Sequence, residues 1–122
     1  MDIGFFTMPI HPIDKDYKKS LSEDRQAFLL ADRIGFSEAY CGEHVTDSAE
    51  NITSSALFIA SIASCTKNIR LGTGTVNMPN SHPAAIAGQI AMLDHMLDGR
   101  LNFGISPGGL ASDAEVFGNI DK

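Results

Sequence analysis

The sequence contains no tryptophan and only two cysteines, Cys41 and Cys65, among its 122 residues. Two cysteines are too few for the disulfide framework of a small secreted domain, so we expect a reduced, cytoplasmic protein in which both cysteines serve packing. No apolar run approaches the roughly 20 residues of a membrane-spanning helix. The basic region that opens a secretory signal is also missing. We therefore expect no association with a membrane.

Positive charge is scarce as well. Nine lysines and arginines stand against 15 aspartates and glutamates, which gives a formal net charge of −6. Proteins that bind the phosphate backbone of nucleic acids usually concentrate positive charge, so we expect no nucleic-acid partner. A hydrophobic content of 43% and a charged content of 20% are typical of a folded globular domain. The length allows a single domain over residues 1–122.

Short apolar stretches with the character of buried strands recur along the chain. They begin at Ile3, Ser37, Ile69 and Leu101, at spacings of 34, 32 and 32 residues, about the size of one strand–helix unit. Strands that alternate with helices pair in parallel through right-handed crossovers. The sequence therefore predicts an α/β protein with a parallel sheet.

Helices are expected between these strands. The first begins with a capping box at Ser20–Glu23 and ends at Gly35, the second spans Ser54–Thr66, and the third runs over Pro83–Asp98 and ends at Gly99. The strands that they connect are expected at Ile3–Phe6, Phe36–Gly42, Ile69–Val76 and Leu101–Ile105.

Two architectures are built from such units: a doubly wound open sheet and a (β/α)8 TIM barrel. The first usually carries a G-x-G-x-x-G motif after its first strand, and Met8–Pro12 does not match it. We therefore predict a TIM-barrel fold. A complete barrel needs about 250 residues, so this chain supplies only the first four strands, a half-barrel with two bare sheet edges. Either the chain is a fragment, or two chains cover one another.

Ligands bind at the carboxyl ends of the strands in such folds. Glu43–His44 follows the second strand and is the sharpest candidate, because a histidine there can exchange a proton near neutral pH. The alternative is a histidine that only forms loop hydrogen bonds. Because consecutive strand residues point to opposite faces, we assign the catalytic role to His44 and a supporting role, orienting the loop or a ligand, to Glu43. Further candidates at strand ends are His11, Thr73, Gly74, Asn77 and Gly108.

The four histidines show no spacing typical of metal ligands, so we predict no metal site. His11 precedes a proline and is a weaker candidate for ligand contact. His82 is expected to shape the start of the third helix. His95, inside that helix, is expected to be structural.

The second and third predicted helices are apolar on nearly all sides and rich in small residues. Tight packing within one chain and contact with a second subunit both explain this composition, and the second explanation predicts a homodimer. The small residues are Ala56, Ala60, Ala63, Ala84, Ala85, Ala87, Gly88 and Ala91.

Seven segments, taken in order and spacing, are more specific together than any one alone. They are His11–Pro12, Gly42–His44, Ile69–Val76, His82–Pro83, Leu93–Arg100, Phe103–Ile105 and Ser106–Asp113. The set resembles the bacterial luciferase-like flavin-dependent monooxygenase family over essentially the whole chain. The first and last segments resemble its limonene-monooxygenase-like branch.

The resemblance implies a barrel that binds reduced FMN, supplied by a flavin reductase, and uses O2 to oxidise a small organic substrate. His44 matches the histidine that acts in the oxygen chemistry of the flavin. Thr73 and Gly74 match the strand end that packs against the isoalloxazine ring, where the family often has a non-proline cis peptide. Further cofactor contacts are expected at Asn77, Ser106 and Gly108. The second and third helices match the family's dimer interface.

The chain also departs from the family pattern. Ser106–Pro107 replaces the glycine and arginine of many members, so one polar flavin contact is expected to differ. Strands five to eight are absent, and with them most phosphate-binding and substrate-selecting loops. Two other functions stay open: a deazaflavin-dependent oxidoreductase that transfers hydride on the same barrel, and a non-catalytic half-barrel module.

Overall fold

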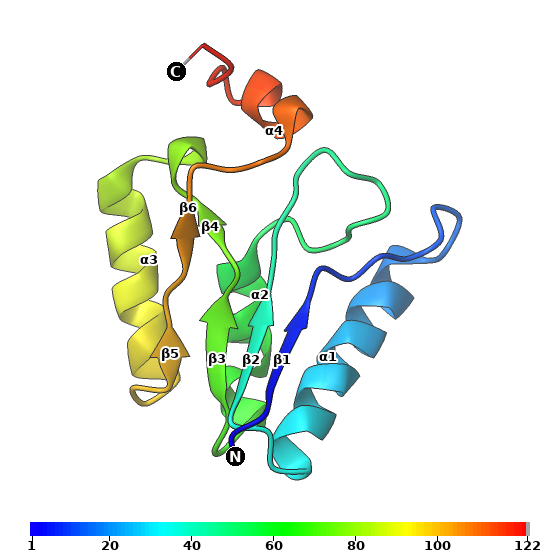
Figure 1. Cartoon of the computed structure of the whole chain (residues 1–122), viewed down its shortest axis with the longest axis vertical. Helices are drawn as coiled ribbons and strands as arrows, with labels where there is room; N and C mark the ends of the chain where they lie inside the picture. Colours follow the sequence, from blue (N-terminus) through cyan, green and yellow to red (C-terminus); the bar gives the residue numbers. More distant parts are fainter. Residues whose placement is uncertain (122) are drawn as a thin grey trace.

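A computed structural model describes residues 1–121. Strands and helices alternate along the chain (Figure 1). The strands are β1 (Gly4–Thr7), β2 (Glu38–Cys41), β3 (Arg70–Thr73), β4 (Val76–Asn77), β5 (Leu101–Asn102) and β6 (Ile105–Ser106). The α-helices are α1 (Tyr17–Arg33), α2 (Ser55–Ile62), α3 (Pro83–Met96) and α4 (Ala111–Val116), and the 3-10 helices are η1 (Ala63–Cys65) and η2 (Met78–Asn80).

The main sheet has four parallel strands in the order β1-β2-β3-β5. A short parallel pair, β4 and β6, continues β3 and β5 toward their carboxyl ends (Figure 1). This topology confirms the predicted α/β fold with parallel strands. Within residues 1–121, no helix combines the length and the apolar character needed to cross a bilayer.

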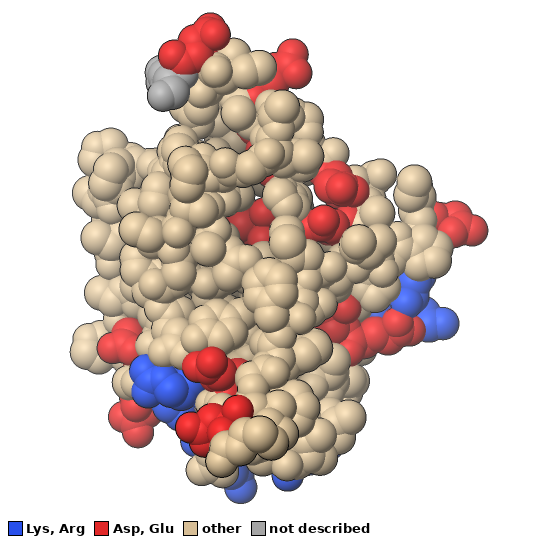
Figure 2. All heavy atoms as spheres, viewed as in Figure 1, with Lys and Arg blue, Asp and Glu red and all other residues tan. Residues whose placement is uncertain are grey.

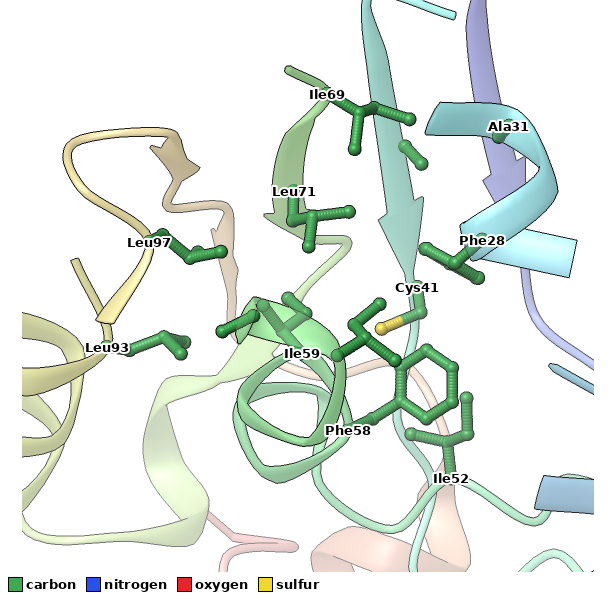
Figure 3. Close-up of a cluster of buried hydrophobic side chains, with 13 residues drawn as sticks. Phe28, Ala31, Cys41, Ile52, Phe58, Ile59, Ile69, Leu71, Leu93 and Leu97 are labelled. Carbon is green, nitrogen blue, oxygen red and sulfur yellow. The ribbon is translucent and has the colours of Figure 1, made fainter. Parts of the chain in front are cut away.

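One face of the sheet packs against the helices and forms the core. Phe5, Ala39 and Leu71 are aligned in the strand register and belong to this face. The ring of Phe28 on α1 lies edge-on to Phe5 and Phe58, with centroids 5.3 and 5.1 Å away. The labelled members of the buried cluster (Figure 3) are Phe28, Ala31, Cys41, Ile52, Phe58, Ile59, Ile69, Leu71, Leu93 and Leu97.

Within residues 1–121, the other face of the sheet lacks a covering layer. Its aligned residues are Phe6, Tyr40, Gly72 and Asn102, one from each strand of the main sheet. Phe6 is 60% exposed. Because side chains alternate between the two faces of a strand, this row lies opposite the helix-packed core.

The predicted start of the first helix was wrong by several residues. Asp16 caps α1, since its carboxylate accepts a hydrogen bond from the Lys19 amide at 2.8 Å. Ser20 lies inside the helix, where its hydroxyl donates to the Asp16 carbonyl, and the Glu23 carboxylate pairs with Lys15 instead of capping. Aspartate accepts from helix amides as well as serine does, so the earlier residue took the role.

The third and fourth predicted strands are each divided into two. The Gly74–Thr75 peptide, which is cis, separates β3 from β4. Beside it, the Thr73 hydroxyl donates to the Gly104 carbonyl at 2.8 Å and accepts from the Gly104 amide at 2.9 Å. A side chain therefore replaces strand pairing there. A Cβ at Gly104 would lie 2.2 Å from the Thr73 carbonyl oxygen, so only glycine permits this approach.

The predicted second and third helices are shortened at their carboxyl ends. The predicted Ser54–Thr66 helix ends at Ile62 and continues as the η1 turn. The third helix begins at Pro83 as predicted, and His82 caps it by accepting from the Ala84 amide. Ser106, which lies just beyond the predicted strand Leu101–Ile105, belongs to β6, and α4 was not predicted.

Candidate functional site

The predicted site residues follow or end the strands at one end of the sheet, the upper end in Figure 1. His44 follows β2 and lies between two carboxylates. Its Nδ1 is 3.0 Å from Oδ2 of Asp113 on α4, and its Nε2 is 3.6 Å from Oε2 of Glu50 in the β2–α2 loop. A histidine placed between carboxylates can hold a proton and pass it on.

Asp113 fastens α4 to the β2–α2 loop. Its Oδ1 accepts hydrogen bonds from the Val45 amide, the Thr46 amide and the Thr46 hydroxyl, while Oδ2 faces His44. Burial by itself would raise the pKa of Asp113, but the Thr46 hydroxyl, His44 and the two amides outweigh it and lower the pKa. Asp113 is therefore an anionic anchor that orients the imidazole.

Glu43 uses its carboxylate to join three parts of the chain. Oε2 accepts from the amide and hydroxyl of Ser55 in the first turn of α2, at 2.9 and 2.8 Å. Oε1 accepts from the Asn77 amide at 3.0 Å. A carboxylate is favoured at a helix amino terminus, where backbone amides lack partners. Glu43 and His44 thus have different tasks, and the geometry at Glu43 is that of a residue that orients the strand ends.

A chain of hydrogen bonds connects β4, β6 and the loop after β6. The Thr75 hydroxyl donates to Ser106 Oγ at 2.6 Å, and Ser106 Oγ donates to Asn77 Oδ1 at 3.0 Å. Ser106 Oγ also accepts from the Gly108 amide at 3.1 Å. The structure therefore brings the predicted residues Asn77, Ser106 and Gly108 together. We refer to Thr75, Ser106 and Asn77 as the hydroxyl chain.

Thr73 and Gly74 lie at the end of β3 beside the hydroxyl chain. Thr73 is buried, and its hydroxyl is engaged with Gly104. A Cβ at Gly74 would lie 2.8 Å from the Phe6 ring. The backbone of Gly74 therefore meets the exposed aromatic residue of the uncovered sheet face without an intervening side chain.

A cavity of about 320 Å³ opens between Asn77, the loop after β6 and α4. Asn77, Gly108 and Asp113 are among the residues that line it, and its described lining contains no lysine or arginine. Figure 2 shows acidic side chains around the hollow in the upper half of the molecule, whereas lysines and arginines are seen only toward its lower and right parts. The cavity is within the size range of small-molecule sites.

His11 has structural contacts. Its Nε2 is 2.8 Å from Asp24 Oδ1, and its Nδ1 is 3.2 Å from Lys15 Nζ. Burial raises the pKa of Asp24, which the contact with His11 only partly offsets. The His11 amide donates to the Ala49 carbonyl, which joins the β1–α1 loop to the β2–α2 loop. His95 is exposed on α3.

Sequence reasoning missed the parts that Glu50, Thr75 and Asp113 play. Asp113 is 69 residues from His44, and no local pattern indicates that the two meet. The only available signal was its place in the motif Ser106–Asp113. Within residues 1–121, no three His, Cys, Asp or Glu side chains converge to hold a metal ion.

Comparison with known proteins gives consistent matches. The family model described as luciferase-like monooxygenase matches residues 1–122. Limonene 1,2-monooxygenase of Rhodococcus erythropolis is 38% identical over 118 residues, which cover 97% of this chain and 30% of the relative. 4-Hydroxyprotoasukamycin monooxygenase of Streptomyces nodosus subsp. asukaensis is 37% identical and is covered to 32%. The chain thus spans about a third of the length of these relatives.

A solved structure has a closely similar fold. It is the oxygenating constituent of 3,6-diketocamphane monooxygenase from Pseudomonas putida, a type II Baeyer–Villiger monooxygenase in complex with FMN. The TM-score is 0.92 at 28% identity, and the match covers 97% of this chain and 32% of that one. The described strands and helices therefore correspond to one part of a larger fold.

Proposed function

The chain belongs to the luciferase-like monooxygenase family, and from this premise we propose that it forms the amino-terminal, flavin-binding part of a monooxygenase barrel. The whole protein uses reduced FMN and O2 to oxidise a small organic substrate, and a flavin reductase supplies the reduced FMN. The observation that carries this proposal is the convergence of the His44–Asp113 pair, the Gly74 backbone and the hydroxyl chain at neighbouring strand ends.

The residues at these strand ends suit the ring system of FMN. A flat heteroaromatic ring needs an open apolar surface and a few neutral hydrogen-bonding groups. Phe6 beside Gly74 supplies the first, and Thr75 and Asn77 supply the second. The phosphate has no counterpart in this arrangement, because the described lining of the cavity lacks a cation. We assign phosphate binding to the rest of the barrel.

We assign His44 the role of proton donor and acceptor. Bound reduced FMN supplies the electrons that activate O2. Asp113 holds Nδ1 of His44, so Nε2 is the atom that is left to exchange a proton, with Glu50 at 3.6 Å on that side. Glu43 acts as a positioning residue, since its carboxylate holds the amino terminus of α2 and the Asn77 amide in register.

We also propose that the protein is a homodimer whose subunits meet through α2 and α3. Leu57 is 74% exposed and Met92 is 65% exposed, although both are large and apolar. Together with Ala60 and Met96 they line a groove of about 330 Å³ between the two helices. Contiguous exposed apolar surface of this kind is typical of an interface.

Ligand binding to the complete barrel protein tests the proposal. Titration with reduced FMN under anaerobic conditions is expected to give saturable binding, and admission of O2 with substrate is expected to give oxygenated product. Binding of a reduced deazaflavin in preference to FMN would support hydride transfer instead. Failure to bind either compound would identify a non-catalytic module.

A further inference from the structure

The hydroxyl chain has a fixed direction, and we propose that this direction makes Thr75 a hydrogen-bond acceptor that selects the reduced form of flavin through the hydrogen on its N5. The inference rests on the proposed function and deepens it. It concerns which oxidation state the site prefers, and which residues set that preference.

The direction of the chain starts at the side chain of Asn77, which is 7% exposed. Its Nδ2 donates to the Glu43 carbonyl at 3.4 Å. Turning the amide over would bring Oδ1 against that carbonyl, so that two acceptors would face each other. The orientation observed leaves Asn77 Oδ1, which can only accept, facing Ser106.

The fixed orientation of the Asn77 amide in turn fixes the hydrogen bonds of Ser106. A serine hydroxyl has one hydrogen to donate and two lone pairs to accept with. The hydrogen goes to Asn77 Oδ1, and the lone pairs receive the Gly108 amide and the Thr75 hydroxyl. Ser106 therefore has no free hydrogen-bonding capacity, which argues against the direct cofactor contact expected from the sequence and for a positioning role.

Thr75 is the open end of the chain. Its hydrogen is committed to Ser106 at 2.6 Å, so its remaining lone pairs can only accept a hydrogen bond. The residue is half-buried and directly follows Gly74, beside which the Phe6 ring lies. The side chain of Thr75 therefore offers a ligand an acceptor and no donor.

The two oxidation states of flavin differ in whether N5 can donate a hydrogen bond. Reduced flavin carries a hydrogen on N5 and can donate it, whereas N5 of oxidised flavin has only a lone pair and would face another lone pair. A buried acceptor opposite an acceptor is unfavourable, whereas a donor opposite an acceptor forms a hydrogen bond, so Thr75 favours the reduced form. Reduced deazaflavin has a carbon at this position and gains nothing from Thr75.

The test measures the dissociation constants of oxidised and reduced FMN for the complete barrel protein under anaerobic conditions. Reduced FMN is expected to bind at least about tenfold more tightly than oxidised FMN. Thr75→Val should lower the ratio of the oxidised-form to the reduced-form dissociation constant about tenfold. Thr75→Ser keeps the hydroxyl and should retain the wild-type ratio. For a two-electron couple, a tenfold preference for the reduced form raises the midpoint potential of the bound flavin by about 30 mV. The potential in Thr75→Val should therefore be about 30 mV lower than in the wild type, which gives an independent readout.

Ser106→Ala is a second variant, and its expected effect is a gain of affinity for oxidised FMN. Without Ser106 Oγ, the Thr75 hydroxyl is free to turn and donate to N5 of oxidised FMN, so affinity for the oxidised form should rise. Thr53→Val is the matched control, because Thr53 is exposed and its hydroxyl makes no hydrogen bond among residues 1–121; it should change neither constant.

The outcomes separate this inference from the proposed function. If wild-type protein binds both forms and neither Thr75→Val nor Ser106→Ala changes the ratio of the two constants, the inference is wrong and the proposed function stands. If wild-type protein binds neither form, the proposed function fails and the inference fails with it. If Thr75→Val does not fold, an unchanged oxidised-form affinity in Ser106→Ala overturns the inference.

Discussion

Nδ1 of His44 lies 3.0 Å from Oδ2 of Asp113, although 69 residues separate the two in the sequence. The contact joins the end of β2 to α4, which follows the last described strand. The other carboxylate oxygen of Asp113 holds the backbone just after His44. One aspartate therefore sets both the loop conformation and the direction of the imidazole.

Replacing His44 should lower product formation while leaving FMN binding nearly unchanged. His44→Ala in the complete barrel is expected to leave FMN affinity within a few-fold and to lower oxygenated product by about 10²-fold, the usual scale for loss of general acid–base catalysis. Reduced FMN should then be consumed mainly with release of hydrogen peroxide. Product and peroxide are measured together, with His95→Ala on the exposed side of α3 as control. Unchanged coupling in His44→Ala would remove this residue from the mechanism.

Asp113→Asn should destabilise the fold in a pH-dependent way. The variant keeps an amide oxygen as acceptor but loses the charge, so we expect a loss of about 1–3 kcal/mol in the free energy of unfolding near pH 7. Because folding lowers the pKa of Asp113, its contribution is fully present above the ordinary aspartate pKa of about 4 and is lost as the pH falls through the lower folded value. Urea unfolding from pH 7 to pH 3 measures the difference between the two proteins.

The difference in the free energy of unfolding between wild type and Asp113→Asn should become smaller only at the acid end of this pH range. A difference that stays constant down to pH 3, or grows on acidification, would show that the Asp113 carboxylate does not stabilise the fold in its ionised form. Val116→Ala on the same helix is the control for local disturbance of α4, because Val116 is 64% exposed and takes no part in the hydrogen bonds of Asp113.

An arginine in the groove between α2 and α3 should disperse the homodimer. Ala60 lines this groove, and Ala60→Arg would place a charge in a close helix contact without a partner. Light scattering is expected to give the dimer mass for the wild type and the monomer mass for the variant. Ala27→Arg, at an exposed position of α1, should remain dimeric. A dimer that persists in Ala60→Arg would place the interface elsewhere.

The two cysteines should differ sharply in reactivity. Burial strongly raises the pKa of the Cys41 thiol. Cys65 is exposed, so the expectation that both cysteines serve packing was wrong for this residue. Since the thiolate is the reactive form, a thiol reagent should modify one equivalent per chain in the folded protein, at Cys65, and two after unfolding in urea. Mass spectrometry identifies the modified residue. Rapid native modification of Cys41 would contradict its place in the core.

Much of the architecture is readable from local pattern. Apolar strand runs at a period of 32 to 34 residues, with helix signals between them, predicted the order and parallel pairing of the main strands. Element boundaries were less accurate. Either Asp16 or Ser20 can cap a helix, and the choice of Asp16 depends on how α1 packs.

For the site, the sequence by itself determined which residue types stand at the strand ends. His44, Asn77 and Gly108 were predicted from position, because parallel strands bring their carboxyl ends to one edge. Ser106 was predicted from the family resemblance. Only the tertiary structure decided the partners of these residues. The Asp113 contact and the direction of the hydroxyl chain from Thr75 to Asn77 depend on distances between segments about 30 to 70 residues apart. Hydrogen bonds form only within about 3 Å and with suitable angles, and such geometry is created by packing and not by local sequence.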